Sequence, residues 1–515
     1  MRRTPGRFGA AALFFCLGSS FASAQPDPGR FSLGLDGALD TAAPYRRELA
    51  APSLDAPPPK SSTRRFLTAA GELALAELVP WAWDRYVEDE DFARISWSTV
   101  SANLKTGLTW DDDKFETNQS LHPFQGSLYF QSGRSNGFTY WESGLFALTG
   151  SLIWEFAMEN SHPSTNDLLN TTLGGMVRGE VQYRLAEMLL DNTATGGDRF
   201  WRELGAAFLN PMGAITRLVD GDMARVFPNP PDRLPDGFTL AVELGYRHVG
   251  DSPEDPDQAL VALSARYGDP FAKEVRAPFE SFAALLELAL PEHSPVTRFE
   301  ERGLLRSWDL NDHAAPTRHV FGLSQEYVYI QNDAEVFGAQ MFSAGLLSRF
   351  PLPGGLAAVT DLEALAAPIT AIQTTEAVNP RTGRDYDFGP GGGVLAGVLV
   401  ERDGREVLDA GYGVVWSHTV NGTSDHNTAQ FLRATAVIPI AGPFGLGGGY
   451  RWYSRKSSFA DGRPASRQTQ SEWRAFVSLT FGTPARTAVP DGVIPDGVGS
   501  LKERFGTAPT AEIHP

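Results

Sequence analysis

Two hydrophobic periods divide this chain of 515 residues. From Arg64 to Phe208 apolar residues recur at steps of three and four positions, which is the period of a helix, and from Asp236 onward they alternate with small or polar residues. In the clearest alternation, Trp473, Ala475, Val477, Leu479 and Phe481 are interleaved with Arg474, Phe476, Ser478 and Thr480. The pattern predicts a helical region followed by a region of β-strands.

About twelve alternating runs lie between Phe238 and Gly482, separated by turn dipeptides such as Asp403-Gly404 and Asn421-Gly422. An even number of antiparallel strands, with an apolar face, a small or charged face and aromatic residues near the strand ends, is typical of an outer-membrane β-barrel. A soluble β-sandwich or solenoid in the periplasm would also alternate and is the alternative. The predicted fold class is therefore α+β, in which an N-terminal helical domain precedes an antiparallel, closed, outer-membrane-type barrel of about twelve strands.

The first predicted helix runs from Arg64 to about Tyr86. Its apolar positions recur at helical steps and are Phe66, Leu67, Ala70, Leu73, Ala74 and Leu78. We expect Pro80 to kink or end this helix, because proline lacks the N–H that continues the hydrogen-bond ladder.

Polar residues at helical spacing mark the segment from His122 to Asp191. Glu155 and Glu159 lie one turn apart on one face of a helix predicted over 141–159. Ser164 and Asp167 form a capping box that begins the next helix. The polar stripe of that helix is Asp167, Asn170, Thr171, Gly174 and Arg178. Burial of such groups costs several kcal/mol unless each has a partner, so this segment is the strongest candidate for a site.

The N-terminus has the three parts of a secretory signal peptide, predicted over residues 1–24. Arg2, Arg3 and Arg7 are basic, residues 8–21 are apolar, and Ala22-Ser23-Ala24 resembles a cleavage site. Cys16, the only cysteine, lies inside this segment, so the cleaved chain would hold no disulfide and no thiol nucleophile. The remaining predicted divisions are a disordered linker (25–62), the helical domain (63–226), the barrel (236–482) and a disordered tail (483–515).

Charge and hydropathy narrow the compartment and the partners. The net charge is −18, and removal of the three signal arginines would give −18 − 3 = −21, which disfavours nucleic acid as a partner. We expect the outer membrane of a Gram-negative bacterium, with the periplasm as the alternative. The expected partners are outer-membrane lipid and the barrel-assembly machinery, although the tail after Phe481 departs from the aromatic terminus that this machinery usually reads.

Four stretches between Trp110 and Val219 resemble an uncharacterised bacterial envelope family, domain of unknown function 3943. They read WDDDKFETNQSLHPFQGSLYFQSGRSNGFTYWES, GSLIWEFAMEN, PSTNDLLNTTLGG and AAFLNPMG. The resemblance implies an envelope location, often with a C-terminal barrel-like region, and implies no activity.

A second similarity is to VanZ-like membrane proteins, which share the order of a histidine, a helix carrying glutamate, and Ser-x-x-Asp followed by Asn and Gly. The matching positions are His122, Glu155, Ser164, Asp167, Asn170 and Gly174. This chain departs from that family because it has no apolar segment of transmembrane length.

Three interpretations of the polar residues stay open. In the catalytic one His122 is a general acid or base, with Glu155 or Glu159 beside it and Asp167 and Asn170 across a gap between two helices. The substrate would then be a lipid or an envelope glycan. In the other two, the residues form a buried network that fixes helix register, or bind a small molecule or lipid.

Motifs for other chemistry are missing. The sequence contains neither Gly-x-Ser-x-Gly nor His-Glu-x-x-His, and the run Asp111–Asp113 lacks the spacing of a calcium loop, which favours a solvated turn. We expect no cofactor and no metal. The predicted function is a structural or transport-type envelope protein whose helical domain is periplasmic or plugs the barrel lumen. The alternative is a lipid- or glycan-acting enzyme.

Overall fold

The computed structural model describes residues 60–250, 257–291, 294–311, 315–374, 378, 383–402 and 404–483. The predicted signal peptide, the predicted linker before residue 60 and the predicted tail after residue 483 lie outside these ranges and stay predictions.

Helices occupy the first part of the described chain and begin at local signals. Ser61 caps the first of them by accepting a hydrogen bond from the backbone N–H of Arg64, and Thr139 and Glu142 form a capping box at the start of another. The helices are α3 (Ser62–Tyr86), α4 (Trp97–Thr106), α5 (His122–Ser135), α6 (Tyr140–Ile153), α7 (Thr165–Leu169), α8 (Gly175–Leu189), α9 (Gly196–Leu209) and α10 (Pro211–Asp220). We call residues 62–220 the helical domain.

Pro80 lies inside α3 and does not end it, and the helix runs to Tyr86 as predicted. The helix continues to Tyr86 because its buried face is packed on both sides of the proline, at Ala76 and Glu77 before it and at Asp84 after it. Packing of this kind supplies most of the stability of a protein helix and outweighs the loss of one hydrogen bond.

Twelve strands follow and close on themselves. They are β1 (Phe238–Val249), β2 (Asp257–Tyr267), β3 (Phe282–Leu290), β4 (Val296–Asp309), β5 (Arg318–Gln331), β6 (Val336–Leu352), β7 (Leu356–Gln373), β8 (Tyr386–Arg402), β9 (Arg405–His418), β10 (His426–Ala441), β11 (Phe444–Ser458) and β12 (Ser466–Thr483). Neighbouring strands are antiparallel, and β1 pairs with both β2 and β12. The predicted fold class is confirmed.

The charged faces of the strands point into the barrel. The carboxylate of Glu287 on β3 accepts hydrogen bonds from Arg451 on β11 at 2.7 and 2.9 Å, and Arg474 on β12 also bonds to it. Arg298 on β4 donates to the Tyr453 hydroxyl on β11 over 2.5 Å, although β11 lies five strands away in the closed order. Contacts between strands that are not neighbours show that these side chains reach across the lumen.

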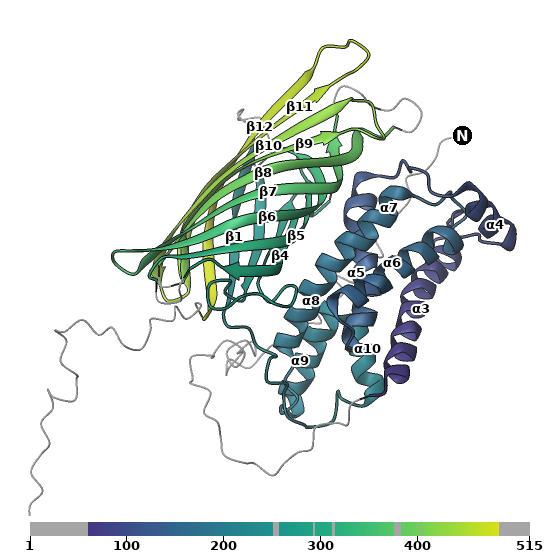
Figure 1. The fold of residues 1–515 in the computed structure, drawn as a ribbon, viewed down its shortest axis with the longest axis horizontal. Helices are drawn as coiled ribbons and strands as arrows, with labels where there is room; N and C mark the ends of the chain where they lie inside the picture. The colour runs from purple at the N-terminus through teal and green to yellow at the C-terminus, as the bar shows by residue number, and fades with distance from the viewer. Residues whose placement is uncertain are drawn as a thin grey trace, which may run out of the picture.

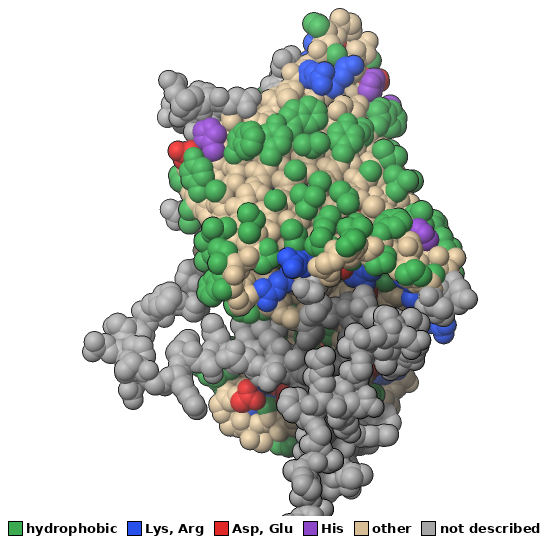
Figure 2. All heavy atoms as spheres, turned by 90° about the vertical axis from the view of Figure 1, so that its left-hand side faces the viewer, with side chains coloured by type: hydrophobic (Ala, Val, Ile, Leu, Met, Phe, Trp, Pro, Cys, Tyr) green, Lys and Arg blue, Asp and Glu red, His purple; other side chains and the backbone are tan. Residues whose placement is uncertain are grey.

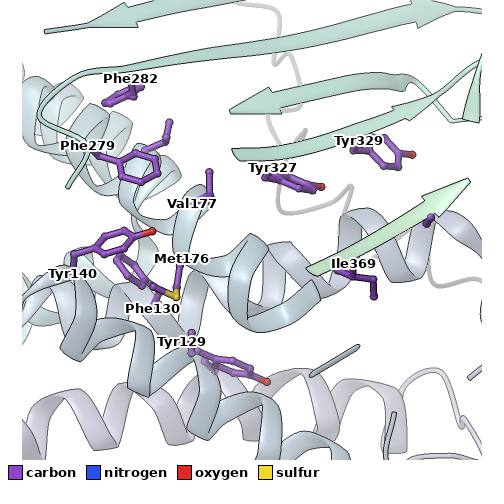
Figure 3. Close-up of a cluster of buried hydrophobic side chains, with 14 of the residues drawn as sticks. Tyr129, Phe130, Tyr140, Met176, Val177, Phe279, Phe282, Tyr327, Tyr329 and Ile369 are labelled. Carbon is purple, nitrogen blue, oxygen red and sulfur yellow. The ribbon is translucent and has the colours of Figure 1, made fainter. Parts of the chain in front are cut away.

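The helical domain packs against the outer wall of the barrel. Along β5, Glu326 faces Arg302 and Ser343 inside the barrel, so Gln325 and Tyr327 point outward because alternate residues face opposite sides. The hydroxyl of Tyr140 on α6 donates to Gln325 over 2.7 Å. Figure 1 shows the helices beside the barrel, and Figure 3 shows Tyr327 and Tyr329 directed toward them.

The expected lumen plug is therefore wrong, and the expected periplasmic position stays a prediction. The domain reaches one rim, where β1 begins, through stacking of Tyr140 on Phe279, which lies just before β3. It reaches the other rim through Glu116, which accepts from Ser294 in the β3–β4 turn over 3.1 Å. We call these the first and the second rim. Side chains of the barrel itself extend into the lumen, as the contact of Arg298 with Tyr453 shows.

Not one of the described helices combines the length and the apolar character that crossing a membrane requires.

Candidate functional site

Three π-helical segments meet at the end of the helical domain nearest the second rim. η1 (Thr117–Leu121) leads into α5, η2 (Trp154–Met158) continues α6, and η3 (Asn170–Gly174) joins α7 to α8. Such segments often occur at functional sites, where they redirect side chains. Here they bring together a cluster that we call the polar centre, which consists of Asp111, Asn118, His122, Glu155, Asn166 and Asp167.

Asn166 is the hub of the polar centre. Its side-chain nitrogen lies 2.8 Å from the carboxylate of Asp111, 3.1 Å from the Asn118 oxygen and 3.0 Å from the carboxyl of Asp167. Its side-chain oxygen accepts from the Ser164 hydroxyl over 2.8 Å and from the backbone N–H of Asp111 over 3.2 Å. One amide therefore ties the loop before η1 to the start of α7.

His122 lies at the edge of this hub. Its Nε2 is 3.4 Å from the Asp167 carboxyl, and its Nδ1 is 3.3 Å from the hydroxyl of Thr171 in η3. The His122 side chain is 11% exposed, so very little of the ring reaches the surface.

Glu155 occupies the other side of the centre. Its carboxyl accepts a hydrogen bond from the backbone N–H of Ser164 over 2.6 Å. Asn103 on α4 donates to the backbone oxygens of Glu155 and Glu159 over 3.4 and 3.1 Å. Because Ser164 also caps α7, Glu155 fixes the point at which that helix begins.

Burial determines the protonation states of the centre. It raises the pKa of Asp167, and the negative charge of Asp111 raises it further. Burial also acts on Asp111, but the hydrogen bonds from Asp167 and Asn166 outweigh it and lower the pKa of Asp111 below its ordinary value. At neutral pH these opposite shifts favour a charged Asp111 and a protonated Asp167.

The neighbouring groups are neutral at the same pH. Burial lowers the pKa of His122 to about 4, against the opposing effect of Asp111. Burial raises the pKa of Glu155 well above its usual range, and the charge of Glu159 adds to the effect. Burial likewise raises the pKa of Glu159 to about 8.

Outward-facing residues of the barrel complete the centre. The hydroxyl of Tyr386 on β8 accepts from Asn118 over 2.7 Å and donates to the backbone oxygen of Asp113 over 2.5 Å. Arg384 donates to the backbone oxygen of Asp111 over 2.8 Å. The polar centre is thus also part of the seam between the helical domain and the barrel.

The arrangement can hold and exchange a proton, but it has little access to a substrate. The hub groups are hydrogen-bonded to one another, and the carboxylate of Asp111, the hydroxyl of Ser164 and the imidazole of His122 all have partners. A cavity of about 130 Å³ lies elsewhere in the domain, lined by residues that include Ser135, Tyr183 and Glu203. Among the residues that the structure describes, no cluster of three or more His, Cys, Asp or Glu side chains could hold a metal ion.

The five residues singled out from the sequence do not form one cluster. His122, Glu155 and Asp167 lie in the polar centre. Asn170 points instead to Gln340 on β6, 3.5 Å away, and Glu159 lies at the margin, where its backbone binds Asn103.

Sequence reasoning missed Asn166, Asn118 and Asp111. Asp111 was expected in a solvated turn, and that prediction is wrong because Asn166 and Asn118 both donate to its carboxylate. The only local signal was that Asn166 stands between two capping-box positions. The contributions of Arg384 and Tyr386 could not be seen, because they lie more than 250 positions away in the sequence, as the 268-residue separation of Asn118 and Tyr386 shows.

The fold defines the class of protein as a closed antiparallel barrel with a helical domain attached to its outer wall. The polar centre lies where the two parts meet. Residues 107–212, which include the whole polar centre, match the family described as Domain of unknown function (DUF3943). The resemblance stated from the sequence is confirmed over these residues. Among curated proteins, none matches the chain.

Solved structures with some similarity to this chain include bacterial porins and channels. The NanC porin is 9% identical, covers 47% of this chain and 98% of its own, with a TM-score of 0.26. OccK8 (OprE) of Pseudomonas aeruginosa is 10% identical, with 48% and 98% covered and a TM-score of 0.17. The KdgM porin, solved in complex with disordered oligogalacturonate, is 9% identical, with 46% and 98% covered and a TM-score of 0.21. At such TM-scores the likeness supports no argument about function.

Proposed function

We propose that this protein is an outer-membrane barrel that does not conduct solutes and whose role is to hold the helical domain in place in the envelope. The observation that carries the proposal is the set of side-chain contacts that cross the lumen. Arg298 contacts Tyr453 across it, and Arg455 on β11 donates to Glu335 in the β5–β6 turn over 2.7 Å. Phe337 on β6 packs edge-on against Phe431 on β10, with ring centroids 4.9 Å apart.

The outer surface of the barrel supports a membrane location. Large apolar side chains are exposed on many strands, among them Leu244, Val394, Trp416, Ile438 and Trp473. Figure 2 shows hydrophobic side chains spread over the wall opposite the helical domain, with basic side chains at its edges. This distribution is the one that a lipid-facing barrel wall requires.

The polar centre acts in this proposal as a structural network. Its hub groups satisfy one another, and Tyr386 and Arg384 include the barrel in the same network. A fully satisfied polar cluster fixes the register of the elements that it joins. In this proposal the polar centre fixes the position in which the helical domain packs on β8 and the strands beside it.

Conductance in planar lipid bilayers tests the closed lumen. The refolded full chain should give no stepwise current. A Phe337→Ala/Phe431→Ala variant removes two rings from the lumen and serves as the positive control, which should give at least transient steps. A matched variant on the outer wall, Val394→Ala, should behave as the unchanged protein does.

Steady conductance of the unchanged protein would overturn the closed lumen and favour a transport role. Loss of an envelope phenotype in a Glu155→Gln/Asp167→Asn variant that stays folded would instead favour the enzymatic alternative.

A further inference from the structure

In the helical domain, charged side chains are buried and large apolar side chains are exposed, which reverses the arrangement usual in a soluble protein. On α3 the carboxylates point inward, with Glu72 only 2% and Glu77 only 3% exposed. The opposite face of the same helix exposes large apolar side chains, and Leu67 and Val79 are 64% and 60% exposed. The exposed apolar side chains of α3 are Phe66, Leu67, Leu75, Leu78, Val79 and Trp83.

Glu72, one of the buried carboxyls of α3, has defined partners. Glu72 accepts from the Thr216 hydroxyl of α10 over 2.6 Å and from the Asn136 amide over 2.8 Å. These contacts explain why a carboxylate can lie inside the domain while leucines of the same helix lie outside.

Helices α9 and α10 show the same arrangement, with charged side chains buried and apolar side chains exposed. Arg199 on α9 is buried and donates to Glu203 over 3.0 Å, and Arg217 on α10 donates to the same carboxylate over 2.6 Å. The outward side chains of these helices are Phe200, Trp201, Leu204, Phe208, Leu218 and Val219. Soluble monomers rarely expose a contiguous apolar surface of this extent.

Exposed charge is confined to the ends of the apolar surface. No charged side chain of α3 between Phe66 and Trp83 is exposed, whereas Arg64 precedes this stretch and Asp89 follows it. On α6, Glu142 is exposed in the first turn, and beyond it Leu145, Leu152 and Ile153 are exposed. Apolar middles with charged ends are characteristic of surfaces that lie in a bilayer.

The position of the domain makes its outer surface continuous with the lipid-facing wall of the barrel. The helices cover the outward residues Phe299 on β4, Tyr327 on β5 and Tyr386 on β8, which would otherwise face lipid. They extend between the two rims, from Phe279 to Ser294, which is the height of the barrel wall. A domain docked there stands at the depth of the bilayer.

We propose that the outward surface of α3, α6, α9 and α10 contacts the acyl chains of the membrane that holds the barrel. The inference rests on the proposed function, since it requires the barrel to be inserted. Contact through one face does not require any single helix to be apolar all round. The inward carboxylates and arginines are then shielded from lipid by the apolar faces of their own helices.

Site-directed spin labelling of the full chain tests the contact. Cys16 is the sole native cysteine and is replaced by serine, so single cysteines can be placed at Leu75, Leu145 and Phe208. Leu244→Cys on β1 reports the barrel wall, and Asp89→Cys, at a side chain that is 74% exposed, reports water. The collision rates of each label with oxygen and with a water-soluble nickel chelate are measured in phosphatidylethanolamine–phosphatidylglycerol vesicles.

We expect the three helical labels to resemble Leu244→Cys, with high oxygen and low nickel accessibility. Helical labels that resemble Asp89→Cys, while Leu244→Cys reports lipid, would overturn the inference and leave the barrel proposal intact. Water exposure at Leu244→Cys as well would overturn the proposed membrane barrel itself. Low access to both reagents with spin–spin broadening would show a second copy on this surface, which also overturns the inference.

Discussion

The lumen of the barrel and the polar centre of the helical domain are both buried polar networks, but they are neutralised differently. In the lumen, Glu287 is surrounded by the guanidinium groups of Arg298, Arg451 and Arg474. The hub of the polar centre contains carboxyls, amides and one imidazole, and burial keeps several of these groups protonated or neutral. The first network depends on opposite charges and the second on protons. The difference predicts that the polar centre responds to moderate changes of pH more strongly than the cluster around Glu287 does.

The largest expected effect comes from removing the lumen carboxylate. Glu287→Leu leaves Arg451 and Arg474 buried without their counter-charge and should destabilise the barrel by about 3–5 kcal/mol. The measurement is the temperature at which the folded band disappears on a denaturing gel of unboiled samples. The exposed pair of Asp461 and Arg463 gives the control, because Asp461→Leu should cost about 1 kcal/mol or less. Equal shifts for both variants would contradict a stabilising lumen network.

A smaller loss is expected at the hub of the polar centre. Asn166→Ala removes the donor shared by Asp111, Asn118 and Asp167 and should cost about 1–3 kcal/mol in the helical domain. Hydrogen exchange of α5 and α7 measures it, with Asn160→Ala as a control at an exposed asparagine. Unchanged exchange in Asn166→Ala would show that the hub does not hold these helices together.

The helical domain should also show a pH dependence. Burial raises the pKa of Glu155, and of Glu159 to about 8, so the folded domain holds these protons more tightly than the unfolded chain. Their contribution to stability is complete below the ordinary carboxyl pKa and is lost as the pH rises through about 8. The helical domain should therefore lose stability between about pH 5 and about pH 9.

The variant Glu155→Gln/Glu159→Gln should make this profile less steep, because neither side chain can then lose a proton. Glu72 and Glu77 on α3, whose pKa values burial raises to about 7 and about 8, still titrate in this variant. Urea titrations followed by hydrogen exchange of α6 give the profile. The barrel, measured in the same samples by the heat-dependent gel shift, should show the smaller change over this range. A pH dependence of equal size in both regions would erase the contrast between the two networks.

The strands of the barrel could be predicted from the sequence because successive side chains of a β-strand point to opposite faces of the sheet, so apolar and polar residues alternate along the chain. Leu244 and Val477 sit opposite each other on one face, and Arg247 and Arg474 on the other, as the period of two requires. The side of the barrel on which the helical domain docks could not be predicted. Tyr327 and Phe337 belong to similar alternating runs, yet one faces the helices and the other the lumen.

The helices show a second limit of prediction from the sequence. Their apolar positions were recognised on α3, but Phe66, Leu67 and Leu78 lie outside while Glu72 and Glu77 lie inside. Helical periodicity identifies two faces and does not say which is buried. The polar centre was found in part, because Ser164, Asp167 and Glu155 are close in sequence. Asp111 comes from the loop before η1 and Asn118 from η1 itself, and Tyr386 on β8 binds Asn118; only the folded chain brings them together.

Chemical cross-linking tests the central claim, that the helical domain docks on the outside of the barrel. The guanidinium of Arg178 on α8 lies 4.5 Å from the ring of Phe299, which faces outward on β4, whereas the next residue, Glu300, bonds to Arg298 inside the barrel. In membranes, a short bis-maleimide should join Arg178→Cys to Phe299→Cys and leave Arg178→Cys/Glu300→Cys unlinked. Linkage of the second pair and not the first would contradict the account, since it would place the helices in the lumen.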